Sequence, residues 1–178
     1  MFNTTIATQI YAKICFEATN SQKKIIENLS EYLSDDDFSR IFVLNGFAGT
    51  GKTTLIAALV AALKELRIKP VLLAPTGRAA KVLARYCGEQ ALTIHKRIYR
   101  QRTNADYESK FSLDFNREQG AVFIVDEASM LSDSTGDGAL FGSGSLLEDL
   151  VSYVRSGRGC RLILVGDSAQ LPPVGCDF

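Results

Sequence analysis

Four short apolar runs divide this chain into regular segments. They occupy residues 41–44, 71–74, 121–125 and 162–165, and each is continuous rather than alternating with polar positions. A strand that is covered on both faces has no polar side, so continuous runs of this length are typical of buried parallel strands. We therefore expect a mainly parallel sheet.

Helical periodicity fills the intervals between these runs, at residues 21–33, 52–66, 77–86 and 145–155. Alternation of strands and helices predicts an α/β fold of three layers, with helices flanking the sheet. Right-handed crossovers place the carboxyl ends of parallel strands at one edge, where ligands bind. Two segments interrupt the pattern. Residues 99–119 are polar with little helical period, and residues 132–145, rich in Gly, Ser and Asp, are expected to form a mobile loop.

Composition narrows the class of protein. The chain has 178 residues, of which 46% are apolar, and its 20 basic residues balance 20 acidic ones, so any anionic partner requires a local patch. Four cysteines without a CxxC pair, and a single histidine, argue against structural zinc and indicate reduced thiols. No leader or membrane-spanning segment is evident, so we expect a cytoplasmic protein without a membrane partner.

The sequence GFAGTGKT at residues 46–53 matches the pattern GxxxxGK[ST] between a strand and a helix. Glycines let backbone N–H groups turn inward, and the following helix adds partial positive charge, so the loop predicts a polyphosphate site for ATP. Lys52 is expected to reach the β- and γ-phosphates and Thr53 to coordinate Mg²⁺. The expected nucleotide contacts in this segment are Gly46, Phe47, Ala48, Gly49, Thr50, Gly51, Lys52, Thr53 and Thr54.

Two acids, Asp126 and Glu127, follow the third apolar run. Paired carboxylates at the end of a buried strand are costly unless a cation accompanies them. We expect Asp126 to bind Mg²⁺, usually through water, and Glu127 to orient and deprotonate the attacking water. An alternative interpretation is an acid pair that caps the next turn.

Five motifs together resemble a known family. GFAGTGKTT, APTGRAAKVL, TIHK, VDEASM and VGDSAQLPPVG occur in this order between residues 46 and 175. They resemble the first RecA-like domain of a superfamily 1 DNA helicase, closest to the RecD-like branch, and the resemblance covers roughly residues 20 to 175. It implies ATP-driven translocation on single-stranded DNA with strand separation, by two RecA-like domains. Residues 1–178 would form one such domain, with the second RecA-like domain absent.

The resemblance also assigns roles to the last motif. It implies that Gln170 senses the γ-phosphate and that Asp167 anchors the loop, while Pro172 and Pro173 restrict the loop to extended geometry. The alternative is a proline-stiffened surface turn. Without the arginine finger of a second domain, which contributes about 10³ to 10⁵ in turnover, we expect ATP binding with very slow hydrolysis.

The predicted DNA contacts follow the second apolar run. The resemblance assigns Pro75, Thr76 and Arg78 to the DNA backbone, and Thr76 is in N-cap position. Two basic groups are expected to form a local patch, although a solvated cationic face is the alternative for Lys81 and Arg85. The groups are Arg78, Lys81 and Arg85, and then Lys96, Arg97, Arg100 and Arg102.

Four further residues keep two interpretations each. His95 lies in a segment that resembles one near the DNA groove, or it is a structural histidine. Tyr86 and Tyr99 either stack on bases or are buried or capping residues. Gln22 reads the adenine edge in related helicases, which would favour ATP over GTP, but Thr19 and Gln22 also form a capping box.

Two other functions remain open at this point. An isolated P-loop nucleotide-binding or regulatory module would bind ATP without DNA-stimulated hydrolysis. A P-loop kinase would need a pocket for a phosphate acceptor, and no such pocket is evident in the sequence.

Overall fold

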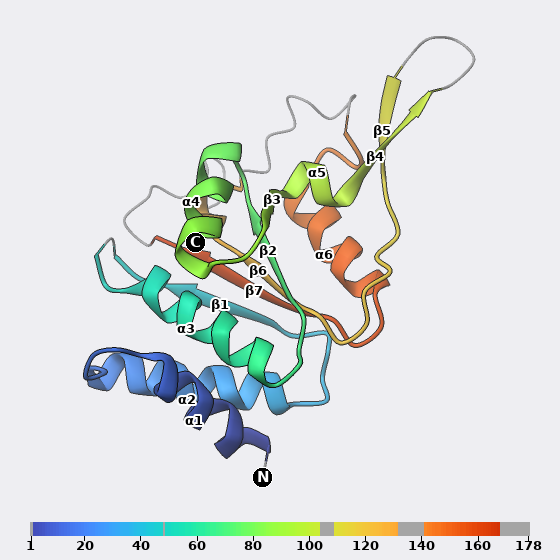
Figure 1. The fold of residues 1–178 in the computed structure, drawn as a ribbon. Helices are drawn as coiled ribbons and strands as arrows, with labels where there is room; N and C mark the ends of the chain where they lie inside the picture. The colour runs from blue at the N-terminus through green and yellow to red at the C-terminus, as the bar shows by residue number, and fades with distance from the viewer. Residues whose placement is uncertain (1, 48, 104–108, 132–140, 168–178) are drawn as a thin grey trace, which may run out of the picture.

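A five-stranded parallel sheet forms the centre of the molecule (Figure 1). The structure is a computed structural model and describes residues 2–47, 49–103, 109–131 and 141–167. Within the sheet the strands follow the order β1-β7-β6-β2-β3. Their bounds are β1 Ile41–Asn45, β2 Pro70–Ala74, β3 Ala91–Thr93, β6 Val122–Val125 and β7 Arg161–Gly166.

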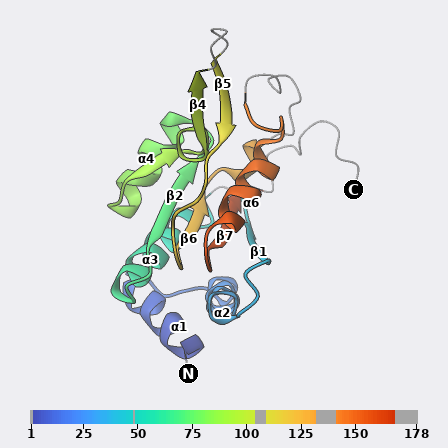
Figure 2. The ribbon, with the colours of Figure 1, turned by 90° about the vertical axis from the view of Figure 1, so that its right-hand side faces the viewer.

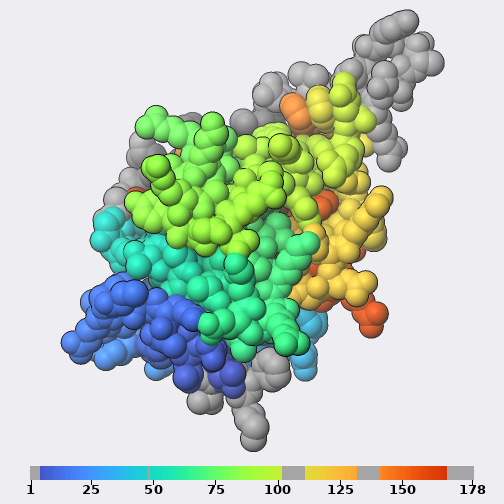
Figure 3. All heavy atoms as spheres, viewed as in Figure 1, coloured from blue at the N-terminus to red at the C-terminus, as the bar shows by residue number. Residues whose placement is uncertain are grey.

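Helices cover both faces of this sheet, as Figure 2 shows from the side. On one face α3 (Lys52–Glu65) packs with α2 (Asn20–Ser34), α1 (Phe2–Lys13) and α4 (Gly77–Cys87). The space-filling view shows that these N-terminal segments hide the sheet on that side (Figure 3). On the other face lie α5 (Ile94–Ile98) and α6 (Leu146–Ser156).

The packing on the two faces of strand β6 explains why its apolar run is continuous. Val122 and Ile124 belong to the core beneath α3, whereas Phe123 and Val125 belong to the core beneath α6. All four side chains are buried. Both faces of the strand therefore require apolar residues, and the predicted three-layer α/β fold is confirmed.

Three elements were not predicted from the sequence. Helix α1 packs Ile6 and Ile10, one turn apart, into the first core. The short strand β3 extends the sheet beyond β2. The interrupting segment 99–119 contains an antiparallel hairpin, β4 (Tyr99–Thr103) with β5 (Ser109–Leu113), which projects from the body of the molecule (Figures 1 and 2).

The described residues test two other expectations only in part. Most of the expected loop 132–145 lies outside the described residues; within the remainder, Ser145 caps α6 by accepting a hydrogen bond from the Glu148 N–H. Cys15, Cys87 and Cys160 are free thiols, as expected. Among the described helices, none combines the length and apolar character needed to cross a membrane.

Candidate functional site

The strand order gathers three of the sequence motifs at one edge of the sheet. Strand β7 lies between β1 and β6, and Asn45 at the end of β1 is in register with Gly166 at the end of β7. On the other side of β7, Val125 pairs with Leu164. The loop after β1, the acids after β6 and Asp167 after β7 therefore emerge side by side.

The loop after β1 has the backbone conformation that its glycines predict. Gly49 and Gly51 have φ angles of 78° and 85°, in the left-handed region that glycine adopts without steric cost. Lys52 begins α3, and its ammonium donates hydrogen bonds to the carbonyls of Gly46 and of Phe47, the latter at 2.8 Å. The loop thus folds around the lysine head group. Ala48 lies outside the described residues.

A cavity of about 460 Å³ joins this loop to the acids. Its wall contains Lys52, Thr53 and Thr54 from the start of α3, and Asp126 and Glu127 from the end of β6. An ammonium group, hydroxyl groups and carboxylates therefore contribute to the lining of one cavity. Such a cavity suits an anion bound to the cation and the helix N-terminus, and a divalent cation between anion and carboxylate.

The two acids differ in environment. Burial raises the pKa of Asp126, although the Glu127 N–H, which donates to Asp126 Oδ1 at 3.0 Å, and the Lys52 charge oppose this increase. Glu127 has φ of 54°, an uncommon conformation for a residue with a side chain. A partly buried acid and a strained neighbour are both frequent at functional sites.

Two residues of this cavity were not assigned to it from the sequence. Ser129, in the 3-10 turn η1 (Ala128–Met130), accepts a hydrogen bond from the Asp167 N–H at 3.4 Å and connects the acid turn to the end of β7. Tyr86, considered above as a base-stacking residue, lines the cavity from the last turn of α4. Ser129 belongs to the motif VDEASM, but its partner is 38 residues away. Gln170 lies outside the described residues.

Gln22 lies on the other side of the loop. Its side chain closes the capping box with Thr19 and donates from Nε2 to the Thr50 carbonyl at 3.3 Å. The capping interpretation is therefore confirmed. Gln22 also lines a second cavity of about 550 Å³, with Ile25 and Phe47 among its apolar walls. Its role toward adenine stays a prediction.

The first group of predicted DNA residues lies at the start of α4. Thr76 caps this helix, accepting a hydrogen bond from the Ala79 N–H at 3.2 Å. Pro75 precedes it, half-buried, and Arg78 is exposed, as are the two other cations of this group, Lys81 and Arg85. The geometry fits an anion site, and the assignment to DNA stays a prediction.

The second basic group corrects an expectation. The sequence predicted a local basic patch here, but the fold brings Glu118 within 2.6 Å of Arg97 and Asp114 within 2.8 Å of Arg100. Lys96 is exposed, and the side chain of Arg102 lies outside the described residues. Ion pairing therefore removes part of the positive charge expected of this patch.

The fold also decides between two interpretations of Tyr99. Its side chain is 5% exposed and its hydroxyl donates to Asp149 Oδ2 at 2.6 Å, so base stacking by Tyr99 is wrong. His95 packs beside it and forms an edge-to-face pair with Phe141, with 5.1 Å between the two ring centroids. This packing fits a structural role for His95, while contact with DNA stays a prediction.

Comparisons with known proteins agree with this geometry. A family model described as AAA domain matches residues 17–176. The chain is 30% identical over 154 residues to the ATP-dependent RecD2 DNA helicase of Deinococcus radiodurans, covering 86% of this chain and 19% of that protein. It is 35% identical over 158 residues to the RecBCD enzyme subunit RecD of Mycobacterium tuberculosis, covering 75% and 24%.

A solved structure shares the fold. The Pif1 helicase from Candida albicans matches with a TM-score of 0.51 and 22% identity, over 89% of this chain and 34% of that one. The chain thus spans only about a fifth to a quarter of the two relatives' length. With the family match extending over most of its residues, this protein belongs to the AAA domain family, whose P-loop implies nucleotide binding.

Proposed function

We propose that this chain is the ATP-binding and ATP-hydrolysing motor domain of a RecD-like superfamily 1 DNA helicase. The observation that carries the proposal is the single cavity shared by Lys52, Thr53, Asp126 and Glu127. A domain that only binds a nucleotide needs the loop, whereas hydrolysis also needs an acid beside the terminal phosphate. The similarity to proteins named as helicases supports the same activity.

In the proposed reaction each residue has a separate role. Backbone N–H groups of residues 46–53 bind the phosphates, and Lys52 exchanges its bonds to the loop carbonyls for the β- and γ-phosphate oxygens. Glu127 orients a water molecule toward the γ-phosphorus and accepts its proton. Ser129 holds the end of β7 against the acid turn, and Gln170 contacts the γ-phosphate from the segment that follows.

The oxygen ligands of the cavity fit Mg²⁺. Thr53 supplies a hydroxyl and Asp126 a carboxylate to the lining of the same cavity, and this cation prefers such hard oxygen donors. When bound, Mg²⁺ supplies charge neutralisation at the β- and γ-phosphates. The remaining contacts that we propose are with the nucleotide, through Gln22 and Thr54.

The substrate of the complete motor is proposed to be single-stranded DNA. Pro75, Thr76 and Arg78 bind its backbone at the N-terminus of α4, and His95 lies along the same path. Because the chain covers only 19% of the RecD2 helicase, we further propose that a second RecA-like domain of a longer protein supplies an arginine finger. Residues 1–178 then form one RecA-like domain.

The helicase proposal is tested by ATP turnover of the longer protein with and without oligo-dT. We expect stimulation by the oligonucleotide, loss of turnover in Glu127→Gln, and reduced stimulation at unchanged basal turnover in Arg78→Ala. Lys24→Ala, an exposed lysine on α2 outside both cavities, is the matched control. Basal turnover that oligo-dT leaves unchanged would instead favour a nucleotide-binding or regulatory module.

A further inference from the structure

A third cavity, of about 520 Å³, lies away from the ATP site. Three arginines line it: Arg97 from α5, Arg100 from β4 and Arg117 from the connector between β5 and β6. Phe115 of the connector and Tyr153 of α6 complete its apolar wall. Lys69, which is paired with the cavity residue Glu118, immediately precedes β2, so the cavity extends toward the amino ends of the strands, opposite the P-loop.

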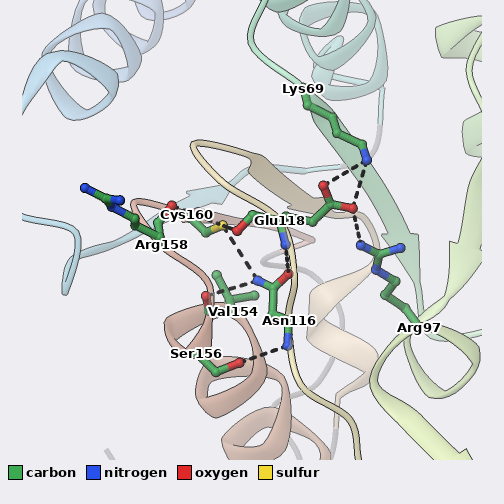
Figure 4. Close-up of polar contacts among 8 residues, drawn as sticks. All are labelled: Lys69, Arg97, Asn116, Glu118, Val154, Ser156, Arg158 and Cys160. Carbon is green, nitrogen blue, oxygen red and sulfur yellow. Dashed lines mark hydrogen bonds and ion pairs between the residues drawn. The ribbon is translucent and has the colours of Figure 1, made fainter.

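The connector is held in place by Asn116, which is 1% exposed (Figure 4). Its Nδ2 donates to the Val154 carbonyl at 3.3 Å, and its Oδ1 accepts from the Glu118 N–H at 3.0 Å. Its own N–H donates to Ser156 Oγ at 3.1 Å. The residues on either side of this buried anchor are therefore presented outward on a fixed backbone.

These outward residues are an aromatic ring and a cation. Phe115 is 65% exposed, the largest exposed fraction among the large apolar side chains that the structure describes. Arg117 is exposed, and no carboxylate pairs with it among the described residues. Exposed aromatic and arginine side chains on a rigid backbone are enriched at protein interfaces.

The charge of the cavity is positive but not uniformly so. Three arginines line the cavity together with two carboxylates, Asp114 and Glu118, and Lys69 pairs with Glu118 from outside the lining. Burial acts to raise the pKa of Glu118, but the hydrogen bonds from Lys69 and Arg97 outweigh it and leave that pKa below its usual value. Glu118 is thus ionised and doubly paired, and about two positive charges remain for a ligand.

One guanidinium retains an unused donor. Arg97 Nε is buried and has no hydrogen-bond partner among the described residues, although Nη2 of the same group binds Glu118. A buried donor without a partner costs free energy, and the guanidinium would relieve this cost by turning toward a new acceptor, such as a ligand carboxylate at the cavity. Arginine forks are suited to carboxylates because two parallel N–H groups match two oxygens.

We propose that this cavity binds an acidic peptide segment of a partner protein. Carboxylates of the segment pair with Arg97 and Arg117, and an apolar side chain beside them packs on Phe115. A nucleic-acid strand fits less well, because its phosphates repeat at every nucleotide and would pass Asp114 and Glu118. The position near the amino ends of the strands also separates the cavity from the proposed DNA contacts at the start of α4.

The test uses two pools of short fluorescent peptides. In one pool Asp or Glu alternates with degenerate apolar residues, and in the other Asn or Gln replaces the acids. We expect the protein to retain the acidic pool only, and the double variant Phe115→Ala with Arg117→Glu to bind it at least about tenfold more weakly. Retention should fall in about 1 M salt, where the Debye length is about 3 Å.

Arg158→Ala is the matched control, because Arg158 is an exposed arginine that points away from the cavity (Figure 4). It should bind the acidic pool within about twofold of the unaltered protein. Equal retention of both pools, or equal binding by the double variant, would overturn the proposal. So would a loss of oligo-dT binding in the double variant without a loss of peptide binding. ATP binding by the double variant is measured alongside. If it is unchanged, a failure of the peptide proposal leaves the proposed ATPase function standing.

Discussion

Asn116→Ala should destabilise the protein because it removes the anchor of the β5–β6 connector. The Val154 carbonyl keeps a second hydrogen bond, from the Gly157 N–H at 3.1 Å, so the main loss is the partner of the Glu118 N–H. A buried donor left unpaired costs about 1 to 3 kcal/mol. The void left by the carboxamide adds about 1 kcal/mol, which gives a total of about 2 to 4 kcal/mol.

Urea unfolding followed by circular dichroism measures this loss directly. In a separate thermal unfolding experiment, the melting temperature of a domain of this size should fall by roughly 8 °C. Arg117→Ala, one residue away and exposed, is the control and should stay within about 0.5 kcal/mol of the unaltered protein. If Asn116→Ala also stays within about 0.5 kcal/mol, the buried hydrogen bonds do not fix the connector, and the peptide site loses its rigid frame.

Three further substitutions address the ATP site and its surroundings. Gly51→Ala should cost about 1 to 2 kcal/mol in urea unfolding, because φ of 85° is unfavourable for alanine, and should weaken ATP binding in a titration. A wild-type unfolding curve would refute the assigned loop conformation. Asp126→Asn should stabilise the protein at neutral pH. Since burial raises the pKa of Asp126, its ionised form disfavours folding above the usual pKa of 3.8, so the gain should shrink as the pH falls toward that value. A gain that does not change with pH would contradict this cause. Thr76→Ala should lose about 1 kcal/mol in thermal unfolding through the missing N-cap, and Thr76→Ser should restore most of it.

Local patterns in the sequence were enough to predict four of the five strands of the central sheet, all except β3. Strand β6 illustrates the reason. Its four residues are buried on both faces of the sheet, so a continuous apolar run in the sequence indicates burial on both sides. The loop at residues 46–53 is equally local, because glycines at positive φ, the lysine and the following helix are contiguous in the chain. Its position beside Asp126 follows from the rules for parallel strands.

Contacts between distant segments were not predictable in this way. Arg97 meets Glu118 only because α5 and the connector pack together, and Tyr99 meets Asp149 across 50 residues of sequence. Neither carboxylate lies in a recognisable pattern with its partner. The basic patch was therefore overestimated, and Tyr99 was considered for a surface role although it is buried.

Isothermal titration of MgATP into the unaltered chain and into Lys52→Ala tests the central claim most directly. Lys52 lies in the cavity that also contains Thr53, Asp126 and Glu127, so its removal should abolish the binding heat while the fold is retained. Far-ultraviolet circular dichroism of the variant verifies the fold. Equal binding of MgATP by the two proteins, or no binding by the unaltered chain, would contradict the assignment of this cavity to ATP.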